Sequence, residues 1–258
     1  MKIGFIGAGK MAQAIISGLD KSKFSIQISG RDLSKTQQTA ATLGVTAASD
    51  HTNLIADAEL VILAVKPHVI PDILSAYTIT QPIISIAAGL TLDNLAEMTS
   101  NTQPLIRVMP NINATIKKST TGIVRNAYVS DETFKAALAI FESIGSVHEI
   151  AEKDFGTFTA LAGSSPAYIY MFIDAMSRAG VLHGMPKDVS TQIVAETLAA
   201  SAEMLLKSGE NPWTLVDNVS SPGGTTISGV VSLEQHQFVA TVIDAITATI
   251  DKNNAMTK

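Results

Sequence analysis

The sequence predicts two domains of different class: an α/β domain with a mostly parallel sheet over residues 1–150, and an all-α domain over residues 151–258. Two observations support this prediction. In the first part, short runs rich in Val and Ile alternate with segments of helical periodicity, which is typical of a parallel sheet with helices on both faces. After about residue 151 these apolar runs stop and helical segments follow one another.

The elements follow in order from these patterns. The predicted strands are Lys2–Ile6, Ser25–Ser29, Glu59–Val65, Pro82–Ala87, Leu105–Met109, Thr121–Val124 and Ser146–Ile150. The predicted helices between them are Lys10–Leu19, Leu33–Leu43, His68–Ala76, Leu92–Met98 and Asp131–Ile144. The helices of the second domain are predicted at Lys153–Leu161, Pro166–His183, Lys187–Ser208, Pro212–Val219 and Thr226–Lys252.

Start and stop residues mark the ends of the later helices. Ser164 and Ser165 precede a first-turn proline at Pro166, which predicts a capped helix start. Gly184 and Gly209 follow the helical segments that end at His183 and Ser208, and they predict these helix ends. Because no repeat or low-complexity linker separates the two domains, we expect them to abut.

Composition excludes several classes of protein. The chain has no cysteine, so disulfides and thiolate metal sites are excluded, which suits a reducing cytoplasm. A net charge of −5 argues against a general nucleic-acid binder. The uncharged stretch Ile73–Leu92 contains too many polar residues for a membrane span. We therefore expect a soluble, cytoplasmic protein that binds neither nucleic acid nor membrane.

A low charge content indicates self-association. Charged residues make up 16% of the chain, against about 25% in ordinary globular domains. The helix predicted over Ala167–Leu182 is apolar nearly all round, with Asp174 and Arg178 as its charged residues. Such a helix must be buried on all sides, and a second subunit is the simplest cover. The alternative is a central helix of a monomeric bundle.

A glycine motif follows the first predicted strand. Gly7 and Gly9, with Ala12, form G-x-G-x-x-A between that strand and a helix, in the stretch GFIGAGKMAQAI. The first glycine permits the tight turn, the second lets the backbone approach a pyrophosphate, and Ala12 allows close packing of helix on strand. This context predicts a dinucleotide-binding, Rossmann-like domain rather than a merely structural glycine-rich turn.

The end of the second strand favours NADPH over NADH. An NAD site usually carries Asp or Glu at this place, whereas the chain has Ser29, followed by Arg31 and Lys35. A hydroxyl and cations suit a 2′-phosphate, which a carboxylate would repel. Asp32 is interpreted as the N-cap of the next helix. NADH as an accepted cofactor stays open. The ends of later strands, LAVKP and SIAAG, are expected to edge the cofactor.

The stretch SSPGGTT, residues 220–226, interrupts the helical second domain. A turn needs one glycine, so two glycines beside clustered hydroxyls indicate a backbone that approaches a ligand. The free N–H groups of a glycine-rich turn and of the helix that follows make an anion site.

Six motifs in order make the whole chain resemble the pyrroline-5-carboxylate reductases: GFIGAGKMAQAI, LAVKPH, SIAAG, RVMPN, AGSSPAY and SSPGGTTISGVVSLE. The last is the most specific, while many dehydrogenases share the first. The resemblance implies hydride transfer from NAD(P)H to the C5=N imine of L-1-pyrroline-5-carboxylate, giving L-proline in the last step of proline biosynthesis. It also implies a helical domain that forms interwoven homodimers, often assembled into decamers.

The resemblance also implies particular site residues. Thr226 would act in catalysis by hydrogen bonding to the ring nitrogen, while Ser221 and the backbone around Thr225 would hold the substrate carboxylate, with Gly223 and Gly224 shaping the loop. Since a protonated imine is already electrophilic, no triad and no metal are expected. The scattered histidines are interpreted as structural. The implied cofactor-binding residues are Gly7, Ala8, Gly9, Lys10, Met11, Ser29, Arg31, Lys35, Asn53, Ala64, Val65, Lys66, Pro67, Ala87, Ala88, Gly89 and Asn111.

Two positions depart from the family pattern. Ser165 stands where the family usually has glycine, and Asn113 stands where it often has proline. The hydroxyl of Ser165 narrows the substrate pocket or caps a helix, and both departures bear on substrate range.

Three other functions were weighed. A 3-hydroxyacid dehydrogenase would carry a lysine in the segment 163–178, and this segment has none. An imine reductase for a related cyclic imine stays open, because the loop recognises a carboxylate and a nitrogen rather than a ring size. A non-catalytic NADPH-binding regulator would not need SSPGGTT.

Overall fold

The computed structural model describes residues 1–256 and divides into two compact units. The first contains residues 1–163 and the end of the chain from residue 250, and the second contains residues 164–249. The division lies later than the boundary at 150/151 predicted from the end of the strand pattern. The reason is that α7 (Phe155–Phe158) belongs to the first unit, where the Phe155 ring lies 4.4 Å beneath the guanidinium carbon of Arg107.

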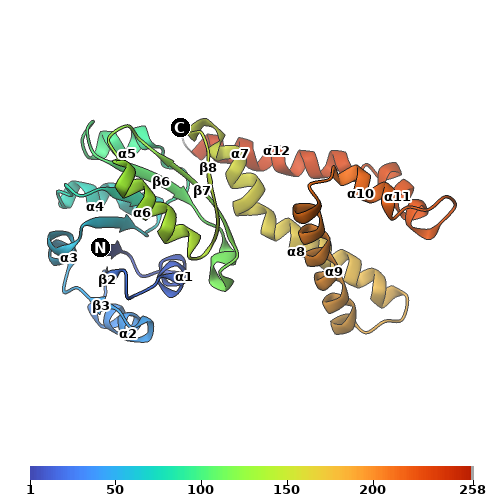
Figure 1. The fold of residues 1–258 in the computed structure, drawn as a ribbon, viewed down its shortest axis with the longest axis horizontal. Coiled ribbons are helices and arrows are strands. Elements are labelled where there is room, and N and C mark those ends of the chain that lie inside the picture. Colours follow the sequence, from blue (N-terminus) through green and yellow to red (C-terminus); the bar gives the residue numbers. More distant parts are fainter. Residues whose placement is uncertain (257–258) are drawn as a thin grey trace. The chain divides into compact units, whose positions relative to one another are not determined.

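The first unit is built on one twisted sheet (Figure 1). In the described part of the chain eight strands pair in the order β3-β2-β1-β4-β5-β6-β7-β8. The pairs from β3 to β6 are parallel, β7 runs antiparallel to β6, and β8 is parallel to β7. The strands are β1 Lys2–Ile6, β2 Ser25–Ser29, β3 Thr46–Ala47, β4 Leu60–Leu63, β5 Ile83–Ser85, β6 Leu105–Met109, β7 Ser119–Arg125 and β8 Gly145–Glu149.

Helices cover both faces of this sheet, and each face has its own apolar core. One core contains residues of α1, α2 and α6, and the other contains residues of α3, α4 and α5. The helices are α1 Lys10–Gly18, α2 Leu33–Leu43, α3 His51–Asp57, α4 Ile70–Ala76, α5 Leu92–Met98 and α6 Asp131–Glu142; short 3-10 turns lie at Pro67–Val69, Ile112–Ile116 and Glu152–Asp154. The predicted α/β class is confirmed.

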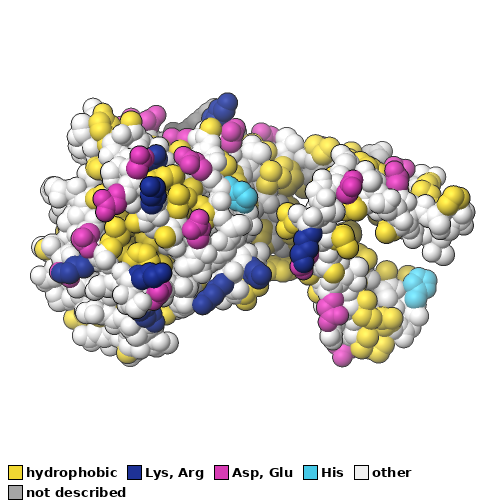
Figure 2. Space-filling view, viewed as in Figure 1, with side chains coloured by type: hydrophobic (Ala, Val, Ile, Leu, Met, Phe, Trp, Pro, Cys, Tyr) yellow, Lys and Arg dark blue, Asp and Glu magenta, His cyan; other side chains and the backbone are white. Residues whose placement is uncertain are grey.

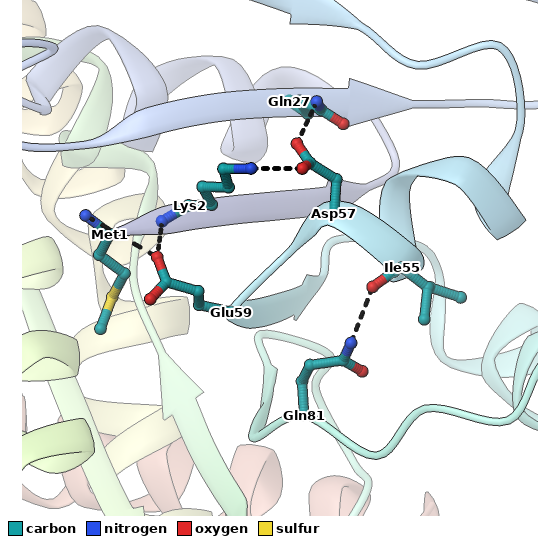
Figure 3. A network of polar contacts seen from close by, with 7 residues as sticks. All are labelled: Met1, Lys2, Gln27, Ile55, Asp57, Glu59 and Gln81. Atoms are coloured by element: carbon teal, nitrogen blue, oxygen red, sulfur yellow. Dashed lines mark hydrogen bonds and ion pairs between the residues drawn. The ribbon is translucent and has the colours of Figure 1, made fainter.

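The amino ends of the strands are tied together by polar contacts (Figure 3). The Lys2 ammonium lies 2.5 Å from a carboxylate oxygen of Asp57, whose other oxygen accepts from Gln27 Nε2 at 2.8 Å. Glu59 accepts from the backbone N–H of Lys2, and Gln81 Nε2 donates to the carbonyl of Ile55 at 2.8 Å. This network lies at the amino ends of the parallel strands. Ligands bind at the other edge of such sheets, outside the carboxyl ends of the strands.

Two short elements were not predicted. Strand β3 has only two residues, and the buried apolar residues of α3, Leu54 and Ile55, are adjacent in sequence and show no helical repeat. The N-cap of α3 is Asp50, whose side chain accepts from the backbone N–H of Asn53 at 2.8 Å. Strand β3 extends the sheet beyond β2, and α3 packs on one face of the sheet.

The second unit is helical, with α8 Ser165–Leu182, α9 Lys187–Ser208, α10 Pro212–Asn218, α11 Thr225–Gln235 and most of α12 Phe238–Met256. Helices α8 and α9 form a hairpin in which a Cβ on Gly180 would lie 2.4 Å from the Ser190 hydroxyl, so this glycine permits their close approach. None of the helices in the described part of the chain is long and apolar enough to span a membrane.

Two predicted helix boundaries were wrong. Ser164 does not cap the helix start before Pro166, because a π-helical segment at Thr159–Ser164 runs directly into α8 and the Ser164 side chain makes no capping bond. The single helix predicted over Thr226–Lys252 is broken between α11 and α12, where Gln237 has a left-handed φ of 57°.

Candidate functional site

The glycine motif forms the turn between β1 and α1. Gly7 has a φ of 104°, and a Cβ there would lie 2.5 Å from the carbonyl oxygen of Ala64, so no other residue fits. Its N–H donates to the carbonyl of Ser29 at 2.8 Å, which fixes the turn against β2. Gly9 is the N-cap of α1 and has no side chain to cap it, so the first N–H groups of α1 stay available to a ligand.

A cavity of about 940 Å³ opens at this turn. It follows the carboxyl ends of β1, β2, β4, β5 and β6, and β1 and β4 flank the place where the strand order reverses. A dinucleotide fits the volume and this location. The predicted cofactor residues that line it are Gly7, Ala8, Gly9, Lys10, Met11, Arg31, Lys35, Ala64, Val65, Lys66, Pro67, Ala87 and Ala88.

Cations dominate the charges that line the cavity. Lys10, Arg31, Lys35 and Lys66 face it, against the carboxylate of Asp32. The Asp32 side chain accepts from the backbone N–H of Lys35 at 3.0 Å, so the predicted N-cap of α2 is confirmed. Its carboxylate is therefore bonded to the helix start. The remaining field suits a ligand with several phosphates.

Four residues expected at the cofactor lie outside the residues that line the cavity: Ser29, Asn53, Gly89 and Asn111. Ser29 is fully buried, and its hydroxyl lies 2.7 Å from His51 Nδ1. Asn53 donates to Ser49 and Asp50 within its own helix start.

Asn111 is also committed to the protein itself. Its Nδ2 donates to the carbonyl of Ala162 at 3.0 Å, and its Oδ1 accepts from the N–H of Asn113 at 3.1 Å. A proline at 113 could not make that second bond, so this departure from the family pattern replaces ring rigidity with a hydrogen bond.

Sequence reasoning missed several residues of the cavity. Most of them follow a strand end or lie on the first turns of α2 and α4, so the strand-end rule could have found Gly30, Met109 and Pro110. His51 gave no such signal, because it belongs to the short helix that no periodicity predicted. The additional lining residues are Gly30, Asp32, Thr36, Thr39, His51, Val69, Ile73, Ile86, Met109, Pro110 and Ile112.

The SSPGGTT stretch forms a tight turn into α11. The carbonyl of Ser221 accepts from the Gly224 N–H at 3.0 Å, with Gly223 at a φ of 68°, which only glycine adopts readily. A Cβ on Gly224 would lie 2.5 Å from the Ser221 hydroxyl oxygen, so each glycine is required for a different reason. Gly224 is the N-cap of α11 and offers no side-chain cap.

Hydroxyls and free amides therefore converge at the start of α11. The N–H groups of its first turn have no intrahelical acceptor, and Ser221, Thr225 and Thr226 are exposed around them. Helix dipole and amides both favour an anion here, and two threonine hydroxyls can donate to or accept from a neighbouring polar atom.

Two family models match the chain. Residues 2–89 match the model described as NADP oxidoreductase, coenzyme F420-dependent, and residues 152–256 match the model of pyrroline-5-carboxylate reductase dimerisation. The pyrroline-5-carboxylate reductase of Escherichia coli (strain K12) is 38% identical over 265 residues, which cover 100% of this chain and 98% of that protein. The chain belongs to the pyrroline-5-carboxylate reductase family.

Other members of this family support the same relation. Pyrroline-5-carboxylate reductase 2 of Bacillus subtilis (strain 168) is 34% identical, with 98% of this chain and 94% of that protein covered. The crystal structure of the Streptococcus pyogenes enzyme superposes with a TM-score of 0.93 at 47% identity, covering 99% of this chain and 98% of that one. The Plasmodium falciparum enzyme with NADP bound gives 0.89 at 32% identity, covering 100% and 98%.

Proposed function

We propose that this chain reduces the C5=N imine of L-1-pyrroline-5-carboxylate to L-proline with NADPH, the last step of proline biosynthesis. The observation that carries the proposal is the SSPGGTT turn: an uncapped helix start with hydroxyls around it, within a chain that is related over its full length to this family. We assign cofactor binding to residues 1–150, and substrate binding and dimerisation to residues 151–258.

The cofactor residues divide by the part of the dinucleotide they suit. The turn from Gly7 to Met11 would hold the pyrophosphate on the N-terminus of α1. Arg31 and Lys35 would neutralise the 2′-phosphate, which favours NADPH while leaving NADH as a weaker alternative. The small residues Ala87 and Ala88 after β5 would leave room for the nicotinamide end.

The substrate residues are those of the α11 start. The carboxylate of the substrate would accept from the first-turn N–H groups and from the Ser221 hydroxyl. The Thr226 hydroxyl would lie against the ring nitrogen. Gly223 and Gly224 keep this backbone open, because a side chain on either would break the turn.

The chemistry asks little of the side chains. NADPH, when bound, supplies a hydride for C5, and the imine nitrogen keeps its proton and becomes the secondary amine of proline. Because the proton is already on the imine nitrogen, the reduction needs no acidic side chain to supply one. The residues of the α11 start orient the imine carbon and exclude water, which is where a large part of the acceleration of such reactions comes from.

Self-association belongs to the same proposal. The family match over residues 152–256 carries the name of a dimerisation region, and most of the large apolar side chains exposed on the chain lie in the second unit. We propose a homodimer as the basic assembly, with a decamer as the higher form. We also propose a cytoplasmic location and no role in nucleic-acid or membrane binding.

The test is turnover by the purified chain. NADPH oxidation is followed with L-1-pyrroline-5-carboxylate in wild type, Thr226→Ala and Thr226→Ser, with Thr214→Ala as a matched control on exposed helical surface. We expect wild-type turnover, a loss of roughly 100-fold in kcat for Thr226→Ala, and partial recovery in Thr226→Ser, because one positioned hydrogen-bonding group at the reacting centre contributes about this much.

Two results would change the proposal. Turnover that survives Thr226→Ala unchanged would keep the reaction and remove the role of Thr226. A folded chain that binds NADPH yet reduces no L-1-pyrroline-5-carboxylate would point to another cyclic imine, or to binding without catalysis.

A further inference from the structure

The Ser29–His51 pair is a buried polar contact at the wall of the cofactor cavity. Ser29 Oγ and His51 Nδ1 lie 2.7 Å apart, Ser29 is fully buried, and His51 lines the cavity. Serine was expected to touch the cofactor itself. Since its hydroxyl is enclosed and used by the imidazole, the residue available to a ligand at this place is the histidine.

The hydrogen of this contact can be assigned by counting donors and acceptors. A serine hydroxyl is a donor as well as an acceptor, and a fully buried one needs an acceptor for its hydrogen. Among the described residues, His51 Nδ1 is the partner recorded for Ser29 Oγ. If Oγ donates to Nδ1, the neutral ring carries its hydrogen on Nε2.

The surroundings keep the ring neutral and fixed. Burial lowers the pKa of His51, an effect that the neighbouring carboxylate of Asp50 opposes. The imidazole packs on the Tyr77 ring in a T-shaped contact, with centroids 5.4 Å apart and an interplanar angle of 77°. A neutral ring whose Nδ1 is occupied has one donor to offer, Nε2–H.

The place of this donor identifies its ligand. Ser29 ends β2, and Arg31 and Lys35 of the following turn and helix line the same cavity as His51. In dinucleotide-binding domains of this kind, residues at the carboxyl end of the second strand lie beside the adenosine ribose. A neutral N–H donor beside two cations suits a phosphate on that ribose, and a hydrogen bond to a phosphate oxygen is stronger than one to a hydroxyl.

We propose that His51 is a specificity-determining residue, whose Nε2–H donates to the 2′-phosphate of NADPH, and that Ser29 is the positioning residue that holds the ring in this tautomer. This inference rests on the proposed function only in the identity of the cofactor. It replaces the direct contact expected from Ser29 by a contact that Ser29 orients.

The experiment measures dissociation constants for NADPH and for NADH, without substrate, in wild type, His51→Leu, His51→Gln and Ser29→Ala. Thr52→Ala is the control, an exposed side chain on the same helix outside the cavity lining. For His51→Leu we expect NADPH to bind roughly 10-fold or more weakly, as for loss of a hydrogen bond to a charged group, while NADH changes less than about 2-fold.

The other variants distinguish the direct hydrogen bond of residue 51 to the cofactor from the positioning of its ring by Ser29. In His51→Gln the amide N–H can replace Nε2–H, so most of the NADPH preference should return. In Ser29→Ala the ring keeps its donor but loses its tether, so the preference should fall by less than in His51→Leu. Thr52→Ala should bind both cofactors like wild type.

Three outcomes would overturn the inference. In the first, His51→Leu weakens the binding of NADPH and of NADH by the same factor, which indicates a structural effect. In the second, the ratio of the two dissociation constants in His51→Leu stays at the wild-type value. If His51→Leu does not fold, a wild-type ratio of the NADPH to the NADH dissociation constant in both His51→Ala and Ser29→Ala overturns it. Failure of the proposed reaction is seen separately, as absent turnover in wild type.

Discussion

Gly7 and Gly9 belong to the same turn but are needed for different reasons. Gly7 has a left-handed φ of 104°, and a Cβ there would lie 2.5 Å from a backbone oxygen, so the fold itself requires glycine. Gly9 has an ordinary φ of −72°, and no heavy atom lies within 4 Å of the place its Cβ would occupy. Gly9 lines the cavity, so we expect that the ligand rather than the fold requires this glycine.

Gly9→Ala should therefore separate stability from cofactor binding. We expect the melting temperature of the cofactor-free protein to stay within about 2 °C of wild type, since the methyl group meets no protein atom. NADPH should bind at least roughly 10-fold more weakly, because overpacking costs about 1–3 kcal/mol. Calorimetric titration and thermal melts check both; a stable variant with unchanged affinity would place the pyrophosphate elsewhere.

The site residues that sequence reasoning found are those fixed by backbone rules. The glycine turn and the strand ends at Ala64–Pro67 and Ala87–Ala88 all line the cavity, and their contact with the cofactor stays a prediction. Ser29 was placed correctly at a strand end, but the pattern could not tell that its hydroxyl is enclosed rather than directed at the ligand. Asn111 shows the same limit, since its amide is used by neighbouring backbone groups.

At the scale of elements, Glu152 joins three parts of the first unit. Its Oε1 accepts from the backbone N–H of Leu92 at the start of α5, at 2.7 Å, and from Arg107 of β6, at 3.0 Å. The Arg107 side chain is 6% exposed and also lies over the Phe155 ring of α7. Without the carboxylate, a nearly buried guanidinium and a helix-start amide would both lose their acceptor.

Glu152→Ala should lower the free energy of unfolding by about 2–3 kcal/mol, below the full cost of breaking a buried pair because Glu152 is itself 28% exposed. Glu152→Gln should lose less, since its amide oxygen can still accept. Glu203→Gln, which breaks an exposed ion pair with Lys207 on α9, is the control and should cost under about 0.5 kcal/mol. Denaturant melts measure all three; equal losses in all three would contradict this account.

The hairpin of α8 and α9 is held at its surface by Asp174. Its carboxylate accepts from Arg178 within α8, at 2.5 Å, and from Lys187 at the start of α9, at 2.7 Å. Hydrogen bonds from Arg178 first and then from Lys187 lower the pKa of Asp174 to about 2. The folded protein therefore binds this proton more weakly than the unfolded chain, whose Asp pKa is about 3.9.

The lowered pKa of Asp174 makes the folded protein more stable above this pKa than below it. The contribution of Asp174 is fully present above about pH 4 and is lost as pH falls towards 2. Asp174→Asn should melt slightly below wild type at pH 7 in low salt, and this difference should shrink between pH 4 and pH 2. Thermal melts across pH test this, with Glu210→Gln as a control carboxylate; a gap that stays constant down to pH 2 would rule out the linkage.

Long elements were predicted from periodicity, and the helix ends at Gly184 and Gly209 from their glycines, but two helix junctions were not predicted. The parallel strands appear as apolar runs because both faces of the sheet are covered by helices. The break at Gln237 gave no signal, because neither Gly nor Pro marks it; a glutamine adopts the left-handed conformation there. The π-helical entry into α8 was equally invisible, since Ser and Pro indicated a helix start that the preceding helical segment overrides.

At the scale of the whole molecule, the second unit buries very little within one chain. In residues 164–249, all of which the structure describes, the buried side chains are Pro166, Ser177, Ser190 and Val194. On α8, Tyr170, Met171 and Leu182 are 59%, 71% and 81% exposed. Figure 2 shows apolar side chains spread over the helical unit. A monomer would leave this surface in water, which favours the predicted subunit contact over the alternative of a central bundle helix.

Met171→Glu tests that assembly. A charge placed on the apolar face of α8 would have to be desolvated in a subunit interface, so we expect the variant to have a lower molar mass than wild type by light scattering, and a lower, concentration-dependent melting temperature. Ile116→Glu is the control, because Ile116 is 68% exposed in the first unit, outside the family's dimerisation match. Wild type should have a mass of two chains or a multiple of two. If Met171→Glu keeps the wild-type mass at every concentration, α8 does not form the contact. The exposed faces of α9 and α12 would then be the surfaces to alter next.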